Sequence, residues 1–515
     1  MRFRLQHNAW QTNPTVFGVV LNPWLARFIL LGSGALVPLM FAPFNLWPLA
    51  FLLPILFWHL TAVEPAKAGW LGWWFGLGFF GAGVSWVYFS MRAVHTPIAV
   101  SVLLSVLFCL SLAFLFAGQA WVGAHWRRFT PSLSLPLLWV LFELLRSTLF
   151  TGLPWLIWGT ASTDTWFSGW LPSIGVFGVS LMWLVGAGLA WQWLRHRHHV
   201  GPLVLGLLLL ITTALGGLAL QQVQWTQPIA TPELRVSLVQ GNVPQDRKWD
   251  PVALREDFAR YQALSTQHPE ATLIVWPETA IAAFPEQLQP ELGDFVAQLD
   301  HQGLLAGMPI WGEQGQYYNA VRGFGQASGE YRKQHLVPFG EYLPFAAVLQ
   351  GLTEFFALPM SGFSAGPSHQ PTLHIEQDGQ LWQLGALICY EVAYPWLARR
   401  QAQHASVLVV LSNDAWFGRS WAPAQHLQIS RVRAIENQRA MVRATQNGIS
   451  AFIAANGEVR AQSEQFVATT LSGSVAARQG HTPYQRWGEW PLALIIAALM
   501  MLIIARAWQS KSNPR

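Results

Sequence analysis

The feature that most constrains this chain is a series of long apolar runs that carry almost no charge. A helix that spans the hydrocarbon core of a bilayer needs about 20 mostly apolar residues. Seven such runs precede the middle of the chain and one lies near its end; they cover residues 25–42, 47–63, 68–90, 98–122, 134–151, 172–194, 202–221 and 490–504. The first two are short and joined by a Pro-containing turn, so a merged count stays open. We predict a membrane α-helical bundle of about eight transmembrane helices.

Composition divides the chain into an apolar and a more polar part. Charged residues make up only 11% of the chain and hydrophobic residues 52%, whereas about 25% charged is usual in soluble proteins. Acidic residues are scarce before about position 232 and common from there to about 480. We therefore predict three segments: a seven-helix membrane domain over 1–228, an α/β domain over 229–482, and a closing helix with its tail over 483–515.

Basic residues predict the orientation of the bundle. If eight helices are counted, the basic residues near their ends fall on one side; they are Arg2, Arg4, Lys67, Arg127, Arg128, Arg195, Arg197, Arg506, Lys511 and Arg515. Only Arg92 falls on the other side. Because positive charge stays in the cytoplasm, both termini should be cytoplasmic and the α/β domain should lie outside. The modest net charge of +5 is explained by this pattern, and no basic patch predicts nucleic-acid binding.

The part after residue 234 has the pattern of an α/β domain. Short β-rich runs cover 235–240, 273–276, 304–308, 318–324, 384–389, 407–411, 441–445 and 450–455, and helical patterns cover 251–267, 285–302 and 424–438. Several runs are continuously apolar, as in strands whose sheet is buried on both faces. About 250 residues are enough to bury a sizeable core.

Three residues that could carry chemistry follow or close predicted strands. Cys389 ends one apolar run, Glu278 follows another, and Lys333 lies after a third. The only other cysteine, Cys109, lies in an apolar stretch, so a disulfide cannot be assumed. A cysteine attacks as a thiolate and needs a base, and the resulting oxyanion needs a cation or N–H donor. Each residue alone has a plain structural reading, but together they predict a nucleophile, a base and an oxyanion stabiliser.

The fifth apolar run contains two charges, Glu143 and Arg146, one helical turn apart. Charges at membrane depth are costly and are usually paired inside the bundle. Both a functional site and a structural ion pair remain open for them. The Trp-rich segment 152–158 that follows should reach the outer face, where anchoring in the headgroup layer and a role in lipid entry both stay open.

Four motifs in the α/β part resemble those of the nitrilase superfamily. They are Trp276-Pro277-Glu278-Thr279, the stretch from Lys333 to Pro344, Ile388-Cys389-Tyr390-Glu391, and Ser412-Asn413-Asp414-Ala415-Trp416-Phe417. Together with Ala42-Pro43-Phe44, Trp139-x-x-x-Glu143-x-x-Arg146 and Gly152-x-Pro154-Trp155, they resemble the bacterial apolipoprotein N-acyltransferases over nearly the whole chain. The resemblance implies a nitrilase-like α/β four-layer (α-β-β-α) sandwich beside the membrane bundle.

The resemblance also implies an activity and its partners. A cysteine thiolate takes an acyl chain from a phospholipid, commonly phosphatidylethanolamine, and passes it to the α-amine of a diacylglyceryl-cysteine on an apolipoprotein. Glu278 would be the base, Lys333 the oxyanion stabiliser and Cys389 the nucleophile, with the Tyr390 N–H as a second donor. The enzyme would work as a monomer in the bacterial inner membrane, with its catalytic domain on the periplasmic side. No metal or other cofactor is implied, and His196, His198 and His199 are read as loop histidines.

Further residues match the family pattern more loosely. Glu341 would hold the Lys333 ammonium, and Glu391 would support the site. Trp249 would lie near the site, and the pocket wall would be formed by Asn413, Trp416 and Phe417. For each of these, a purely structural role stays open. The apolar stretch from Glu341 to about Gly366, which includes Phe355 and Phe356, predicts a lid that enters lipid.

Two other functions compete with acyl transfer. A membrane-anchored nitrilase-type amidase would use the same three residues but would resolve the thioester with water. A transporter or receptor would bind a ligand in the outer domain and would not need Cys389.

Overall fold

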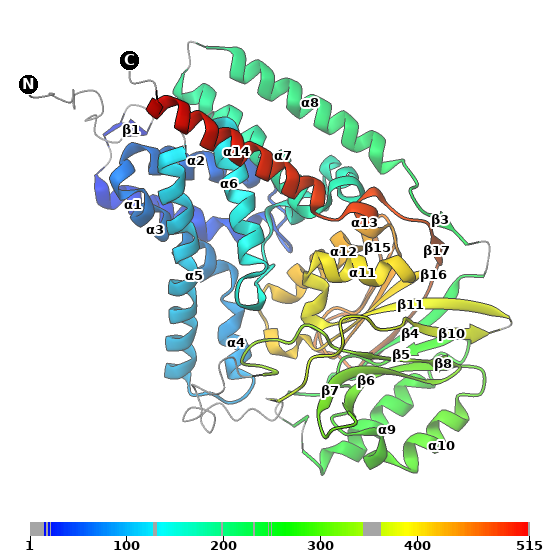
Figure 1. The fold of residues 1–515 in the computed structure, drawn as a ribbon. Coiled ribbons are helices and arrows are strands. Elements are labelled where there is room, and N and C mark those ends of the chain that lie inside the picture. The colour runs from blue at the N-terminus through cyan, green and yellow to red at the C-terminus, as the bar shows by residue number, and fades with distance from the viewer. Residues whose placement is uncertain are drawn as a thin grey trace, which may run out of the picture.

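The computed structural model describes residues 15–16, 19–20, 22–126, 131–196, 199–229, 232–245, 247–248, 250–342, 362–377 and 379–512 of the 515 residues. Figure 1 shows two parts that pack against each other. Helices from both ends of the chain form one part, and the middle of the chain forms an α/β part, in which α9 (Ala253–Ser265) and α10 (Glu291–Gln298) lie farthest from the bundle.

Helices occupy every apolar run that the sequence singles out. They are α1 (Pro23–Leu36), α2 (Leu49–Val63), α3 (Ala68–Gly83), α4 (Trp86–Arg92), α5 (Ile98–Trp126), α6 (Pro131–Arg146), α7 (Leu171–Arg195), α8 (Gly201–Gln221) and α14 (Trp490–Ser512). The run expected over 68–90 is broken into α3 and α4, and the helix expected over 134–151 ends at Arg146.

The number of membrane crossings stays a prediction. Of the described helices, four are long and apolar enough to cross a membrane by length and composition: those of Pro23–Met40, Ile98–Trp126, Trp166–Arg195 and Gly201–Gln221. Leu49–Val63 and Pro65–Gly83 pass only together, as a pair bent by 113°. The expected count of eight therefore exceeds the four or five that this criterion supports, because several of the apolar helices are short.

Helices α1 and α3 pack with their backbones in close contact. A Cβ atom added at Gly78 of α3 would overlap the carbonyl oxygen of Leu31, and one added at Gly34 of α1 would overlap that of Phe75. Small residues at such positions are typical of membrane helix pairs, where close approach replaces the hydrophobic driving force.

Two sheets form the centre of the α/β part. Within the described residues, one sheet has the order β16-β4-β5-β6-β7-β9 and the other the order β15-β14-β13-β12-β11-β10-β8. The first contains β16 (Thr469–Val475), β4 (Leu234–Gln240), β5 (Leu273–Val275), β6 (Gly303–Trp311), β7 (Tyr317–Gly325) and β9 (Glu330–Arg332). The second contains β15 (Val459–Gln462), β14 (Ala451–Ile453), β13 (Met441–Thr445), β12 (Val407–Ser412), β11 (Gln380–Ile388), β10 (Leu373–Gln377) and β8 (Ala327–Ser328).

Helices cover the outer face of each sheet, which confirms the expected α-β-β-α order of layers. Helices α9 (Ala253–Ser265) and α10 (Glu291–Gln298) pack on the first sheet, through a core that includes Phe258, Trp276 and Phe295. The two sheets share a second core between them. Helices α11 (Pro395–His404) and α12 (Ala422–Asn437) cover the other sheet and lie between it and the helix bundle (Figure 1).

Helix α12 is buried on all sides because membrane helices cover the face that solvent would otherwise reach. Its residues share one apolar core with those of the bundle. Three of its side chains accept hydrogen bonds from bundle residues: Gln425 Oε1 from Trp155 Nε1 at 2.8 Å, Gln428 Oε1 from the Ala42 N–H at 2.9 Å, and Glu436 Oε1 from the Val176 N–H at 2.8 Å. These bonds fix the α/β part against the bundle.

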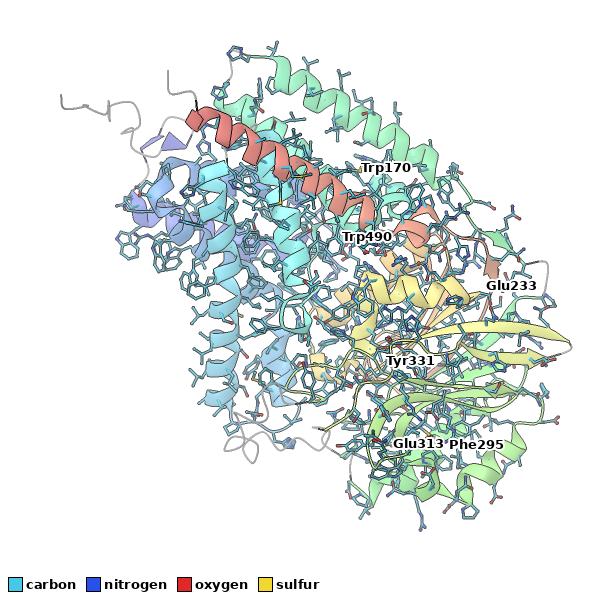
Figure 2. The ribbon with its side chains drawn as sticks, viewed as in Figure 1. Trp170, Glu233, Phe295, Glu313, Tyr331 and Trp490 are labelled. Atoms are coloured by element: carbon cyan, nitrogen blue, oxygen red, sulfur yellow. The ribbon has the colours of Figure 1, made fainter. Side chains whose placement is uncertain are left out.

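Tryptophan rings lie at the bundle, and exposed carboxylates lie on the α/β part. In Figure 2, Trp490 is exposed and lies where α14 leaves the α/β part, and Trp170 lies at the start of α7, where its Nε1 donates to the Thr213 carbonyl oxygen of α8. Glu233 and Glu313, which are also exposed, lie on the α/β part. Indole rings at such junctions favour the membrane interface, and carboxylates favour water.

The close contact between α1 and α3 gives a stability test. Gly78→Ala should destabilise the protein by about 1–3 kcal/mol, since its methyl group would force the two backbones apart. Gly81→Ala on the same helix is the matched control, because nothing lies within 4 Å of a Cβ there. Thermal unfolding in detergent should show a lower midpoint for the first variant only; equal midpoints would contradict the packing.

Candidate active site

Residues from both sheets meet at the carboxyl ends of their parallel strands. Strand β5 pairs in parallel with β4 and β6, and β11 and β13 pair in parallel with β12. Glu278 follows β5, Cys389 follows β11 directly, and Asn413 follows β12 directly. Lys333 follows β9 of the first sheet. The strand ends thus bring together side chains that are far apart in the sequence.

The Lys333 ammonium lies between two carboxylates. Its Nζ is 3.0 Å from Glu278 Oε1 and 2.9 Å from Glu341 Oε1, and all three side chains are buried. The Asn319 amide donates to the same two oxygens, at 2.8 Å each. Although burial opposes a charged lysine, the two carboxylates outweigh it and raise the pKa of Lys333 well above its usual value. The lysine is therefore a fixed cation.

Glu278 is ionised and held at both oxygens. Its Oε2 accepts a hydrogen bond from the Asn413 N–H at 2.9 Å. Burial would raise the pKa of this carboxyl, but the charges of Lys333 and Lys248 and the bond from Asn319 lower it below the usual value. A carboxylate that stays deprotonated at neutral pH can accept a proton from a nearby thiol.

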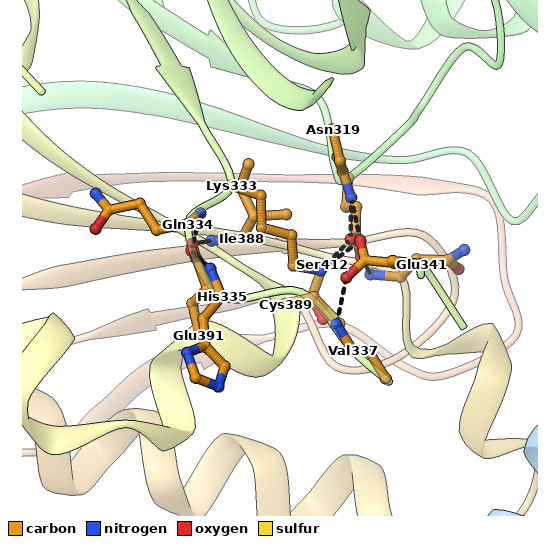
Figure 3. A network of polar contacts seen from close by, with 12 residues as sticks. Asn319, Lys333, Gln334, His335, Val337, Glu341, Ile388, Cys389, Glu391 and Ser412 are labelled. Carbon is orange, nitrogen blue, oxygen red and sulfur yellow. Dashed lines mark hydrogen bonds and ion pairs between the residues drawn. The ribbon is translucent and has the colours of Figure 1, made fainter. Parts of the chain in front are cut away.

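Cys389 lies beside this cluster, near the end of the Lys333 side chain (Figure 3). It has a positive φ of 53°, which is strained for a residue with a Cβ atom. It also begins a short 3-10 helix, Cys389–Ala393, so the Tyr390 N–H lies in the first turn, where N–H groups have no partner inside the helix. Burial and the Glu278 charge raise the pKa of the Cys389 thiol, and Lys333 only partly opposes them. The thiol is therefore protonated at rest.

Glu391 lies on the other side of Cys389 and holds backbone groups. Its carboxylate accepts from the N–H groups of Ile388, Gln334 and His335, at 2.8, 2.7 and 3.1 Å, and from the Tyr331 hydroxyl at 3.1 Å (Figure 3). Burial raises the pKa of Glu391 to about 7 despite these donors. Through them it fixes the strand that ends at Cys389 and the segment that follows Lys333.

Aromatic rings from the bundle and the α/β part pack next to the nucleophile position. Trp155 stacks on Tyr390 with the ring centroids 6.1 Å apart, and it also contacts Phe417 and His426. Phe417 in turn contacts Trp86 of α4 edge to face. Trp416 packs against a small core of Leu336 and Phe363. The bundle therefore contributes directly to the wall of the site.

Glu143 and Arg146 do not form the structural ion pair that was one of the two roles left open for them. No ion pair within 4.0 Å joins their side chains among the described residues, and each instead binds the loop that carries Trp155. Glu143 Oε1 accepts from the Trp158 N–H at 2.8 Å. Arg146 donates to the carbonyl oxygens of Leu153, Trp155 and Leu156. The loop has no regular secondary structure, so its backbone groups need these buried charges as partners.

Several site residues could not be singled out from the sequence. Lys248 is buried and its Nζ donates to the Glu278 carbonyl oxygen at 3.2 Å; burial lowers the pKa of Lys248 to about 8. Asn319 and Arg443 lie inside β7 and β13. A polar residue within an apolar strand was the sequence signal that could have pointed to them. Asp414, His426 and Arg443 form a buried cluster behind Cys389. Trp249 and the lid residues Phe355 and Phe356 lie outside the described residues.

The state of the thiol gives a pH test. Cys389 should be alkylated by iodoacetamide at a rate that rises about tenfold per pH unit from pH 6 to pH 9, because only the thiolate reacts and its pKa is raised above that of a free thiol. The rate is measured by mass spectrometry in a Cys109→Ala background, which leaves one thiol. A plateau below pH 8 would show instead a thiolate stabilised at rest.

Comparisons with known proteins identify the family of this chain. The carbon-nitrogen hydrolase family profile matches residues 235–484, and the profile of the apolipoprotein N-acyltransferase N-terminal domain matches residues 33–189. The apolipoprotein N-acyltransferase of Pseudomonas putida is 40% identical over 93% of this chain and 96% of its own length. That of Azotobacter vinelandii is 39% identical over 95% of this chain and 97% of its own length. A solved carbon-nitrogen hydrolase from Helicobacter pylori is 19% identical, covers 47% of this chain and 89% of its own, and has a TM-score of 0.35. The chain therefore belongs to the apolipoprotein N-acyltransferase family, the acyltransferases that carry a carbon-nitrogen hydrolase domain.

Proposed function

We propose that this membrane protein transfers a fatty acyl chain from a phospholipid to the N-terminal α-amine of a diacylated apolipoprotein, through a thioester on Cys389. The observation that carries the proposal is the packing of the Cys389 loop against the membrane bundle, where Trp155 stacks on Tyr390. This packing supports a lipid substrate, because it holds the nucleophile against the helices that a bilayer would surround. The relatives are named apolipoprotein N-acyltransferases, and the alignments with this chain cover almost their whole length. Their names therefore support the same acceptor and reaction.

The first half-reaction forms the thioester. The Cys389 thiol gives its proton to Glu278 as the sulfur attacks the ester carbonyl carbon of the phospholipid. Because the thiol pKa is raised and that of Glu278 is lowered, this transfer is uphill until the negative charge moves to the carbonyl oxygen. Lys333 and the Tyr390 N–H stabilise that oxyanion, and one such donor contributes about 3 kcal/mol. The carbon–oxygen bond then breaks, Glu278 returns the proton to the leaving oxygen, and a lysophospholipid departs.

The second half-reaction uses the same groups in the reverse direction. The free α-amine of the acceptor attacks the thioester carbonyl, and Glu278 takes a proton from the nitrogen. The same oxyanion site stabilises the second tetrahedral intermediate. The carbon–sulfur bond breaks, an amide remains on the acceptor, and the sulfur regains a proton. Glu341, which binds Lys333 throughout, keeps its ammonium in place when Glu278 is neutral.

The proposal also covers the acyl donor, the oligomeric state, the location of the protein and its domain limits. We infer that phosphatidylethanolamine is the acyl donor, that the protein is a monomer in the bacterial inner membrane, and that its α/β part is periplasmic with both termini cytoplasmic. The domain limits we propose are 1–228, 229–482 and 483–515. The positions of basic residues support this orientation. The amidase alternative has no support in the relatives that cover the whole chain, which are acyltransferases by name.

The transfer reaction is tested with purified protein, phosphatidylethanolamine and a synthetic diacylated lipopeptide. The lipopeptide should gain the mass of one acyl chain, and Cys389→Ala should abolish the gain, since no thioester can form. Cys109→Ala is the matched control, because this second cysteine is buried within α5 and should be dispensable. Transfer by the Cys389→Ala variant at more than about one thousandth of the normal rate would contradict the proposal, since loss of a nucleophile costs more than this.

A further inference from the structure

A buried polar cluster lies directly behind Cys389 and takes no part in the chemistry described so far. Asp414 belongs to the 3-10 helix Asp414–Phe417, His426 to α12 and Arg443 to β13, and all three side chains are fully buried. Arg443 donates to both Asp414 oxygens, at 2.8 and 3.1 Å. The Ser412 hydroxyl donates to Asp414 at 2.7 Å. His426 joins the cluster to the Cys389 backbone, because its Nε2 lies 3.2 Å from the Cys389 carbonyl oxygen.

The partners of His426 determine which ring nitrogen carries its proton. A carbonyl oxygen can only accept, so Nε2 must carry a hydrogen to bond to Cys389. Nδ1 lies 3.0 Å from an Arg443 nitrogen, which can only donate, and 3.1 Å from Asp414 Oδ1. Burial and the Arg443 charge lower the pKa of His426. Nε2 therefore donates to the Cys389 carbonyl whether Nδ1 accepts from Arg443 or donates to Asp414.

The carbonyl that His426 holds belongs to the same peptide unit as the Tyr390 N–H. Because this unit is planar and trans, its C=O and N–H point in opposite directions. A bond that fixes the carbonyl toward α12 therefore fixes the N–H toward the opposite side. We propose that His426 is a positioning residue, which aims the Tyr390 N–H at the oxyanion by holding the Cys389 carbonyl through Nε2. This inference rests on the proposed function, in which that N–H is an oxyanion donor.

Two features of the structure make such a hold necessary. Cys389 has a φ of 53°, a conformation that costs a residue with a Cβ atom about 1–3 kcal/mol and persists only where the surroundings fix it. In addition, a hydrogen bond to a carbonyl polarises the peptide unit and makes its N–H a better donor. The chain Arg443–His426–Cys389 therefore both orients the oxyanion donor and strengthens it, although neither Arg443 nor His426 touches the substrate.

Two polar variants separate this role from a general effect on stability. In His426→Gln, the side-chain amide can reach the position of Nε2 and donate to the Cys389 carbonyl. In His426→Asn, the amide is one methylene shorter and ends near the position of Nδ1. The rate of Cys389 acylation by phospholipid is measured by mass spectrometry in single turnover. It should stay within about tenfold of the normal rate for the Gln variant and fall on the order of 10²-fold for the Asn variant, as when one oxyanion donor is lost.

The rate at which iodoacetamide alkylates Cys389 distinguishes the two roles. This rate should change if His426 only supports the fold, and it should not change if His426 positions the Tyr390 N–H. Alkylation displaces iodide at a saturated carbon and forms no oxyanion, so both variants should react within about threefold of the normal rate. Asn437→Ala is the matched control: Asn437 lies at the opposite end of α12 from His426, and its side-chain amide donates to the Arg433 backbone carbonyl, at 2.8 Å. It should change neither rate.

The outcomes are distinct. Equal acylation rates for the Gln and Asn variants would overturn the role of His426 and leave the proposed function intact. A parallel loss of acylation and alkylation in the Asn variant would show that His426 only supports the fold. Absence of acylation in the unaltered protein would remove the proposed function itself, and the inference with it.

Discussion

The structure depends on the burial of helix α12 between the second sheet and the membrane helices. In a soluble α-β-β-α domain the outer helices face water, but α12 shares an apolar core with the bundle on its outer face. Its polar side chains serve backbone groups of the bundle, such as the Val176 N–H, which follows the point where Gly175 interrupts helical geometry in α7. The site and the bundle therefore form one packed unit, and catalytic residues are positioned from both sides.

Because the site is packed against the bundle, the charges that surround the nucleophile are buried. Removing charges from water costs several kcal/mol each unless they are paired and hydrogen-bonded. Here Lys333 is bound by Glu278 and Glu341, Asp414 by Arg443, and Glu391 by backbone N–H groups and the Tyr331 hydroxyl. A rigid frame keeps these partners in place while charge moves between sulfur, carboxylate and oxyanion. Preorganised charges of this kind stabilise a transition state without reorganisation during the reaction.

The sequence predicted the parts of the site that depend on local pattern. Apolar runs that end in Glu278 or Cys389 marked the strand ends, and the parallel pairing of those strands brought the ends together. What pattern could not predict were contacts between distant segments. Asn319 bridges two carboxylates from another strand, and His426 reaches the Cys389 carbonyl from a helix for which the sequence predicts only the helical pattern. The spacing of Glu143 and Arg146 left a functional site and a structural ion pair open, and it gave no sign that both would bind backbone groups of an irregular loop.

The central claim is that an acyl group on Cys389 is passed to an amine and not to water. The most direct measurement is the discharge of isolated acyl-enzyme, followed by mass spectrometry with and without a diacylated lipopeptide. The account predicts a thioester that persists in water and is lost quickly when the lipopeptide is added, with the acyl mass appearing on the lipopeptide. Equal rates of loss with and without the lipopeptide would contradict it and identify a hydrolase.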